Sequence, residues 1–305
     1  MFAEILLKAR LKRIKRIGAD PFYPLNPCSL KIHNSITFDL SYQKMNLTDT
    51  HIHLYAEEFD ADRSQLIDEA RKAGVERFFL PNIDEQSVSG VFELTKAFPG
   101  VCFPMLGLHP CYVNETYKEQ LAAIRKHINE HSKEIIAIGE IGLDFYWDLT
   151  FKSQQEFAFR EQALLAAEMK LPISIHSRNS TGELINLLRE INHPDLKGVF
   201  HCFSGDINQA DEVMNMGFYL GIGGVVTFKN SGLEKIVSEV PLEFIVLETD
   251  GPYLAPTPFR GKRNNPSYLK LIAERVAEIK NLSLEEIAAA TTKNAVELFN
   301  LGKKN

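Results

Sequence analysis

Apolar and polar positions alternate in blocks along most of the chain. From Leu47 onward, short runs rich in β-branched residues are followed by longer segments in which apolar residues recur at helical spacing. The short runs predict strands, at residues 47–54, 75–83, 101–109, 135–141, 172–177, 198–203, 219–225 and 244–249. The longer segments predict helices, among them residues 63–73, 117–131, 154–170, 183–191 and 209–216.

Eight strands that alternate with helices indicate an α/β fold. Strands joined through helices pair in parallel, because a parallel connection has to cross over the sheet. Uninterrupted apolar runs, such as residues 135–138, are typical of strands that are buried on both faces. An open doubly wound sheet and a closed barrel both fit this order. The count of eight, and the polar residues that end non-adjacent strands, favour a (β/α)8 TIM barrel.

The end of the chain predicts helices that complete the same domain. Apolar residues at 269, 272, 273 and 276 share one helical face, and Ser283 with Glu286 has the form of a capping box that opens a further helix. Residues 291–301 then continue an amphipathic pattern. We expect one barrel domain over residues 45–305, since α/β barrels commonly reach this length.

Residues 1–44 are expected to be an N-terminal extension outside the fold. Residues 1–17 carry six basic residues among aliphatic ones, and Pro21, Pro24 and Pro27 then interrupt the pattern. A secretory signal would place its basic residues before a longer apolar core. A basic amphipathic helix that contacts a membrane or nucleic acid is one alternative. The start of the first strand directly after Met45 favours an extension on which function does not depend.

Charge and composition narrow the classes of function. Residues 1–44 have a net charge of +5, whereas the remaining chain has 26 Lys and Arg against 37 Asp and Glu, a net charge of −11. An acidic body is unsuited to gripping a long nucleic acid, so any such contact should be local and metal-mediated. The four cysteines form no Cys-x-x-Cys pair, and no apolar run approaches the roughly 20 residues that span a bilayer. We expect a cytoplasmic protein without a membrane or an obligate protein partner.

Polar residues stand where the predicted strands end. His51 and His53 end the first strand, and side chains two residues apart on a strand point to the same side. Later strands end in a carboxylate or an imidazole, at Glu140, His176, His201 and Asp250. In a barrel these ends meet on one face, where active sites lie. Six such groups are too many for one tetrahedral zinc and match two divalent ions that share a carboxylate, for which Glu140 is the candidate.

The motifs around these residues resemble the signature of the TatD family, metal-dependent hydrolases of the amidohydrolase-like TIM-barrel class that are described as deoxyribonucleases. The motifs occupy residues 48–53 (TDTHIH), 139–144 (GEIGLD), 176–178 (HSR), 201–205 (HCFSG) and 248–254 (ETDGPYL). The resemblance runs from about residue 45 to residue 301, and residues 1–44 have no counterpart in it. Gly251 stands where members often have Ser or Ala.

The resemblance implies phosphodiester hydrolysis, by an exonuclease acting on single-stranded DNA with two divalent ions (Mg²⁺, Mn²⁺ or Zn²⁺) and a metal-activated water. One ion would be held by His51, His53, Glu140 and Asp250, and the second by Glu140, His176 and His201. Asp250 is the expected general base, and Glu140 the expected bridge.

Further predictions concern the substrate. His109 and Arg178 are expected to contact the scissile phosphate, and Arg260 and Lys262 the flanking phosphates after the eighth strand. Asp144 and Glu248 are candidates for orienting ligand histidines or for binding a third ion. The aromatic residues 145–147 can stack on a base or pack against a neighbouring loop.

Two other classes of function fit the same sequence. A metal-dependent amide, ester or lactone hydrolase could use the same pair of ions, because they polarise a carbonyl as readily as a phosphoryl group. Such an enzyme need not depend on Arg178, Arg260 or Lys262. A non-catalytic barrel that only binds a ligand is the other class, and intact residues at all six ligand positions disfavour it.

Overall fold

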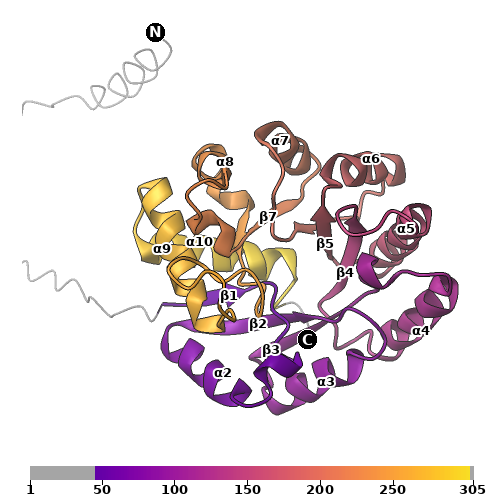
Figure 1. Ribbon diagram of the computed structural model, residues 1–305, viewed down its shortest axis with the longest axis horizontal. Helices are drawn as coiled ribbons and strands as arrows, with labels where there is room; N and C mark the ends of the chain where they lie inside the picture. The colour runs from indigo at the N-terminus through magenta and orange to yellow at the C-terminus, as the bar shows by residue number, and fades with distance from the viewer. Residues whose placement is uncertain (1–44, 303–305) are drawn as a thin grey trace, which may run out of the picture. The chain divides into compact units, whose positions relative to one another are not determined.

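The computed structural model describes residues 45–302, which form a ring of eight parallel strands surrounded by helices (Figure 1). The strands are β1 (Leu47–Asp49), β2 (Val75–Pro81), β3 (Cys102–Leu106), β4 (Ala137–Asp144), β5 (Ile173–Arg178), β6 (Gly198–Phe200), β7 (Tyr219–Ile222) and β8 (Ile245–Leu247). Each strand pairs with the next one along the chain. At the open seam, Thr50 N–H donates to Leu247 O (3.0 Å) and Asp250 N–H to His51 O (2.9 Å). The ring is therefore nearly closed, and the predicted (β/α)8 barrel is confirmed.

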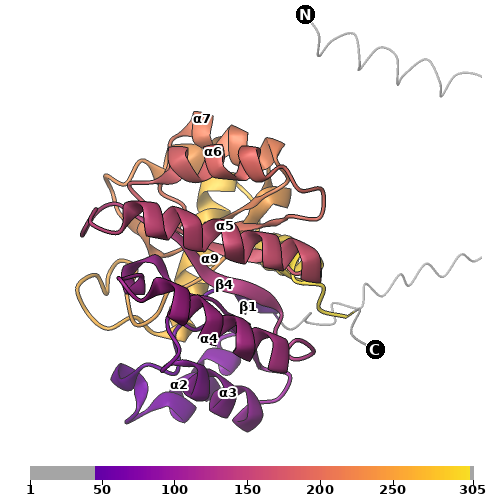
Figure 2. The same ribbon diagram turned by 90° about the vertical axis from the view of Figure 1, so that its right-hand side faces the viewer.

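Helices cover the outside of the strands (Figures 1 and 2). They are α2 (Arg63–Lys72), α3 (Val88–Ala97), α4 (Tyr117–Glu130), α5 (Lys152–Met169), α6 (Thr181–Ile191), α7 (Ile207–Asn215), α8 (Leu233–Glu239), α9 (Leu269–Lys280) and α10 (Leu284–Leu298). The predicted capping box of Ser283 and Glu286 opens α10. Within residues 45–302, no helix has both the length and the apolar character needed to cross a membrane. The predicted extension over residues 1–44 lies outside the described residues.

The strands divide their side chains between two apolar clusters. On β2, Phe78 and Leu80 pack outward against the helices, whereas Phe79 points into the barrel, as the alternation of a strand requires. Inside, Phe79 and Met105 pack with Phe299, which follows α10, and the Phe79 and Phe299 rings lie 4.7 Å apart. The packing of this interior cluster against α10 supports the strands from within.

Several strands are shorter at their carboxyl ends than the sequence predicted. The prediction that residues 47–54 form one strand was wrong, since β1 ends at Asp49 and both histidines follow it in a loop. The reason is that side-chain oxygens there accept hydrogen bonds from backbone N–H groups that a regular strand would pair with the neighbouring strand. Asp49 Oδ1 accepts a hydrogen bond from His51 N–H (3.3 Å), and Asn82 Oδ1 accepts one from Gly107 N–H (2.6 Å) beyond β3. His51, His53, His201 and Asp250 therefore sit on loops that follow their strands, whereas Glu140 and His176 lie on β4 and β5.

Candidate metal centre

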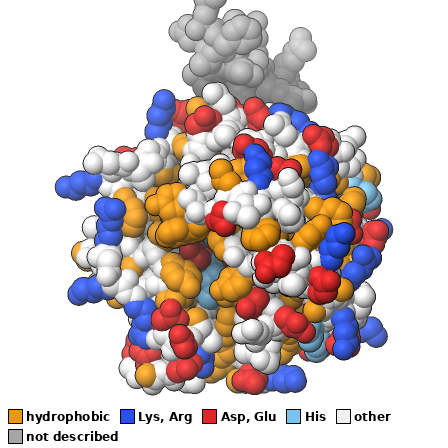
Figure 3. Space-filling model, turned by 45° about the vertical axis from the view of Figure 1, so that its right-hand side comes forward, with side chains coloured by type: hydrophobic (Ala, Val, Ile, Leu, Met, Phe, Trp, Pro, Cys, Tyr) orange, Lys and Arg blue, Asp and Glu red, His pale blue; other side chains and the backbone are white. Residues whose placement is uncertain are grey.

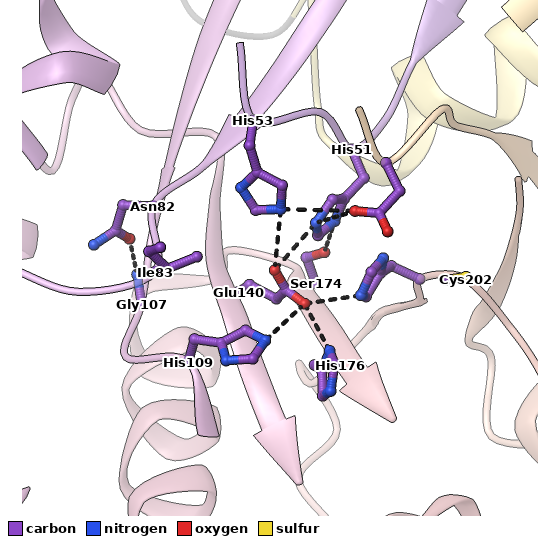
Figure 4. A network of polar contacts seen from close by, with 12 residues as sticks. His51, His53, Asn82, Ile83, Gly107, His109, Glu140, Ser174, His176 and Cys202 are labelled. Atoms are coloured by element: carbon purple, nitrogen blue, oxygen red, sulfur yellow. Dashed lines mark hydrogen bonds and ion pairs between the residues drawn. The ribbon is translucent and has the colours of Figure 1, made fainter. Parts of the chain in front are cut away.

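Glu140 lies on β4 at the middle of a cluster of histidines (Figure 4). Its side chain is buried, and its Oε2 atom is 3.2 Å from His51 Nε2 and 3.6 Å from His53 Nε2. Asp250 Oδ1 lies 3.9 Å and 3.7 Å from the same two ring nitrogens. The end of β1 and the end of β8 thus bring two imidazoles and a carboxylate to one oxygen of Glu140.

The other oxygen of Glu140 faces a second set of rings. Glu140 Oε1 is 2.9 Å from His176 Nδ1 on β5 and 2.8 Å from His201 Nε2 after β6. His109 Nε2, after β3, is 3.3 Å from the same oxygen. The structure therefore brings all six predicted ligands together, with the other five divided between the two sides of the Glu140 carboxylate. His109, expected only at the substrate, belongs to the same cluster.

Each of the four histidines predicted as ligands has its second ring nitrogen beside an oxygen atom, within hydrogen-bonding distance for three of them and as a longer ion-pair contact for His201. These partners are Ser174 Oγ for His51 (3.2 Å), Tyr55 OH for His53 (2.9 Å), Asp144 Oδ2 for His176 (2.9 Å) and Glu248 Oε1 for His201 (3.5 Å). An acceptor at one ring nitrogen keeps the proton there and leaves the lone pair of the other nitrogen free. All four free nitrogens then point toward Glu140, as metal ligands require.

His109 has the opposite arrangement. Its Nδ1 atom accepts a hydrogen bond from the backbone N–H of Cys111 (3.1 Å), at the start of the short helix Pro110–Tyr112. A nitrogen that accepts a hydrogen bond carries no proton, so the proton of the neutral ring is on Nε2. Burial lowers the pKa of His109, which favours this neutral ring. His109 is therefore built to donate a hydrogen bond from Nε2 rather than to bind a metal.

Sequence reasoning missed three residues that support the cluster. Ser174 and Tyr55 orient His51 and His53. Asp49, fully buried, accepts hydrogen bonds from Thr249 N–H (3.0 Å) and Thr249 Oγ–H (2.5 Å), which ties β1 to the end of β8. A signal existed for Ser174, because it lies two residues before His176 on β5 and so shares its face. The partner of Asp49, 200 positions away, has no local signal.

Burial and mutual charge set the protonation of the cluster. Burial lowers the pKa of His51 well below its usual range and that of His53 to about 4, so both rings are neutral near pH 7. Burial alone would raise the pKa of Glu140, but the positive charge of His201 and the hydrogen bond from His109 hold it well below its usual range. Burial alone would lower the pKa of His201, but Glu140 and Glu248 hold it well above. A cation that binds at His201 must therefore displace a proton.

Asp250 differs from Glu140 in the direction in which its pKa is shifted. Burial, with the nearby charges of Glu140 and Glu248, raises the pKa of Asp250 to about 7, although His201 opposes the shift. A carboxyl group with a pKa near neutrality can exchange a proton at physiological pH.

The cluster forms the bottom of a cleft of about 500 Å³. In the space-filling view, histidine side chains lie at the bottom of a hollow between hydrophobic side chains (Figure 3). Of the predicted substrate contacts, His109 and Arg178 line this cleft. Arg260 and Lys262 are exposed and are not among the described residues that line it; the Arg260 guanidinium lies 4.5 Å from the centre of the Phe228 ring.

Comparison with known proteins identifies the family. Residues 48–300 match the family model described as TatD related DNase. The chain is 42% identical over 256 residues to a Bacillus subtilis protein named "Uncharacterized metal-dependent hydrolase YabD", covering 84% of this chain and 99% of that protein. The chain belongs to the TatD family. It is 34% identical over 260 residues to the "3'-5' ssDNA/RNA exonuclease TatD" of Pantoea vagans, covering 83% of this chain and 99% of that protein.

A solved TatD-family structure has the same fold. The TatD homologue YJJV from Escherichia coli superimposes with a TM-score of 0.80 at 28% identity, over 84% of this chain and 99% of that chain. The present chain is thus a metal-dependent hydrolase of the TatD family, as its motifs predicted.

The residues of the cluster fit a divalent cation. Two groups, His51–His53–Asp250 and Glu140–His176–His201, each bring three ligand atoms within 4.8 Å of one another. Neutral imidazole and carboxylate are the donors that Zn²⁺, Mn²⁺ and similar ions bind in proteins. In a TatD-family hydrolase, these two groups are the candidate metal sites.

Proposed function

We propose that the protein hydrolyses phosphodiester bonds at an end of single-stranded nucleic acid, DNA in the first place, with two divalent cations. The observation that carries this proposal is the position of Glu140, a buried carboxylate whose two oxygens each face a separate set of ligand atoms. Paired cations that share a carboxylate are typical of phosphoesterases and nucleases. The name of the Pantoea relative supports the choice of substrate.

The two oxygens of Glu140 suggest how the ligands divide. The first cation would be held by His51, His53, Glu140 and Asp250, and the second by Glu140, His176 and His201. When bound, the cations would lower the pKa of a water molecule and neutralise charge on the phosphoryl oxygens. A donor set rich in imidazole suits Zn²⁺ or Mn²⁺, whereas Mg²⁺ prefers oxygen ligands and retained waters.

The side chains that line the cleft supply the remaining functions. Asp250 borders the cleft next to His51 and His53, where its carboxylate can accept the proton of the nucleophile. Arg178 is well suited to a phosphate, because its guanidinium offers paired donors. His109 donates from Nε2, and a phosphoryl oxygen that approaches Glu140 would lie within its reach. Arg260 and Lys262 are proposed to contact only phosphates farther along the substrate.

The proposal is tested with a time course on end-labelled single-stranded DNA, with Mg²⁺, Mn²⁺, Zn²⁺ or EDTA. We expect stepwise shortening that needs a metal. Glu140→Ala should lower the rate by about 10³-fold or more, because both sites lose a ligand, and Asp250→Asn by about 10²-fold or more. Circular dichroism and the unfolding midpoint show whether each variant keeps the fold.

Two results would contradict the proposal. Full activity in both folded variants would remove Glu140 and Asp250 from the active site. No cleavage with any metal, although two ions bind per chain, would instead favour an amide or ester hydrolase.

A further inference from the structure

Exposed aromatic side chains surround the cleft whose bottom is formed by the candidate metal ligands around Glu140. Tyr112, Trp147 and Tyr253 line it, with exposed fractions of 40%, 71% and 53%. Tyr146, also exposed, contacts Trp147 edge to face at 4.9 Å between ring centres. Among exposed aromatic side chains in residues 45–302, only Phe157 lies elsewhere. Large rings are unfavourable in water, so their concentration at one cleft indicates a ligand that covers them.

The rings stand beside different members of the histidine cluster. Tyr253, after β8, lies 6.0 Å from the His53 ring, on the side of the first ligand set. Trp147, after β4, lies 5.0 Å from the guanidinium of Arg178, which ends β5 two residues after His176 of the second set. Both rings therefore line the cleft that holds the cluster, Tyr253 next to His53 and Trp147 next to Arg178.

The scarcity of basic side chains in the cleft explains why aromatic rings would be needed to hold a nucleic acid. Arg178 is the one Lys or Arg side chain among the described residues that line the cleft, and the chain after residue 44 has a net charge of −11. Within the cleft, contacts between phosphates and basic side chains therefore contribute little to holding a nucleic acid. Stacking of bases on aromatic rings does not depend on charge, and proteins that bind single strands combine it with a few cations.

We propose that Trp147 and Tyr253 stack on unpaired nucleobases on the two sides of the scissile phosphate, while Arg178 contacts the phosphate between them. This inference rests on the proposed phosphodiesterase function and makes the bases part of what the site recognises. In a duplex only the outer face of a terminal base is free, so the base on the other side of the scissile phosphate has no face to offer a second ring. The arrangement therefore selects unpaired ends without selecting a sequence.

The sole tryptophan of the chain gives a direct signal for this contact. In the full-length Glu140→Ala protein, which is expected not to cleave, a single-stranded oligonucleotide should quench Trp147 fluorescence. An abasic oligomer of the same length has the same phosphate charge and should bind at least 10-fold more weakly. A blunt duplex of the same sequence should behave like the abasic oligomer.

Variants assign the effect to the two rings. In the same background, Trp147→Ala and Tyr253→Ala should each weaken binding of a labelled single strand by about 10-fold or more, measured by fluorescence anisotropy. Trp147→Phe keeps an aromatic face and should stay within about 3-fold of the parent protein. Phe157→Ala removes an exposed ring outside the cleft and should change nothing.

Equal binding of abasic and normal strands, or unchanged binding in both alanine variants, would overturn the inference. Cleavage by the wild-type protein separates this failure from failure of the proposed function. If abasic and normal strands are cut equally well, the phosphodiesterase stands and base recognition falls. If neither strand is cut with any metal, the phosphodiesterase falls as well.

Discussion

The inside of the barrel has an apolar layer and a polar layer, and the two lie only two residues apart along the same strands. On β6, Val199 belongs to the interior apolar cluster, and His201 of the metal cluster follows two residues later. On β8, Val246 belongs to the apolar cluster, and Glu248 beside His201 follows at the same interval. Both layers face inward because of the two-residue period of a strand.

The two layers differ in what they need. Apolar residues in the lower layer are stabilised by burial alone and tolerate neighbours of many kinds. Every buried atom of the polar layer needs a partner, since an unpaired buried polar group costs about 1–3 kcal/mol. A protein gains nothing in stability from such a cluster that an apolar core would not supply. The polar layer is therefore explained by chemistry, and variants in each layer should separate stability from activity.

The largest effect is expected in the apolar layer. Phe299→Ala removes a buried ring that packs on Phe79, and it should lower the free energy of unfolding by about 3–5 kcal/mol, because the cavity cannot collapse fully. Urea denaturation measures this change. Activity per folded molecule and the number of bound metal ions should stay at wild-type values.

A matched control lies just before the same helix. Leu282→Ala trims a side chain that is already 38% exposed, so its effect should stay within about 0.5 kcal/mol. Loss of metal from Phe299→Ala under conditions in which it is fully folded would show that the two layers are not independent.

A smaller effect is expected for His109 in the polar layer. His109→Asn should lower the rate of phosphodiester hydrolysis by about 10²-fold, as the loss of one hydrogen-bond donor to a developing charge does in other enzymes. It should still bind as many metal ions as the wild type, measured by elemental analysis after gel filtration. His201→Asn is the control, since removing a proposed ligand should lower the metal content. A lost ion in His109→Asn would mean that His109 is a ligand after all.

His109 also shows where prediction from sequence stops. The barrel followed from the regular spacing of apolar runs, and the six ligand candidates followed from their places at strand ends and within motifs. The role of His109 depends on which nitrogen carries the proton, and that is fixed by the backbone N–H of Cys111 in a turn whose geometry the sequence did not reveal.

The supporting contacts were unpredictable for a related reason. Periodicity along one strand shows which face a residue occupies but not what lies opposite it. Asp49 accepts a hydrogen bond from Thr249 across the seam of the barrel, and His51 contacts Ser174 on β5. Each partner is more than 100 positions away in the chain. The loop that follows β1 exists because Asp49 takes hydrogen bonds that a continuing strand would have used. Prediction of β1 was wrong at that point.

The smallest effect should come from Ser174, which tests whether the orienting partners matter to metal binding. Ser174→Ala removes the hydroxyl beside His51 Nδ1 but leaves every proposed ligand in place. The ring of His51 then loses the contact that keeps its proton on Nδ1, so affinity for one of the two proposed ions should fall by about 10-fold. Competition with a chelating dye measures this change. The free energy of unfolding should change by only about 1 kcal/mol, the contribution of one hydrogen bond.

Ser238→Ala on α8, outside the barrel, is the control and should leave the affinity for both proposed ions unchanged. Wild-type affinity for both ions in Ser174→Ala would mean that packing alone orients His51, and the polar layer would then need fewer partners than its hydrogen bonds suggest.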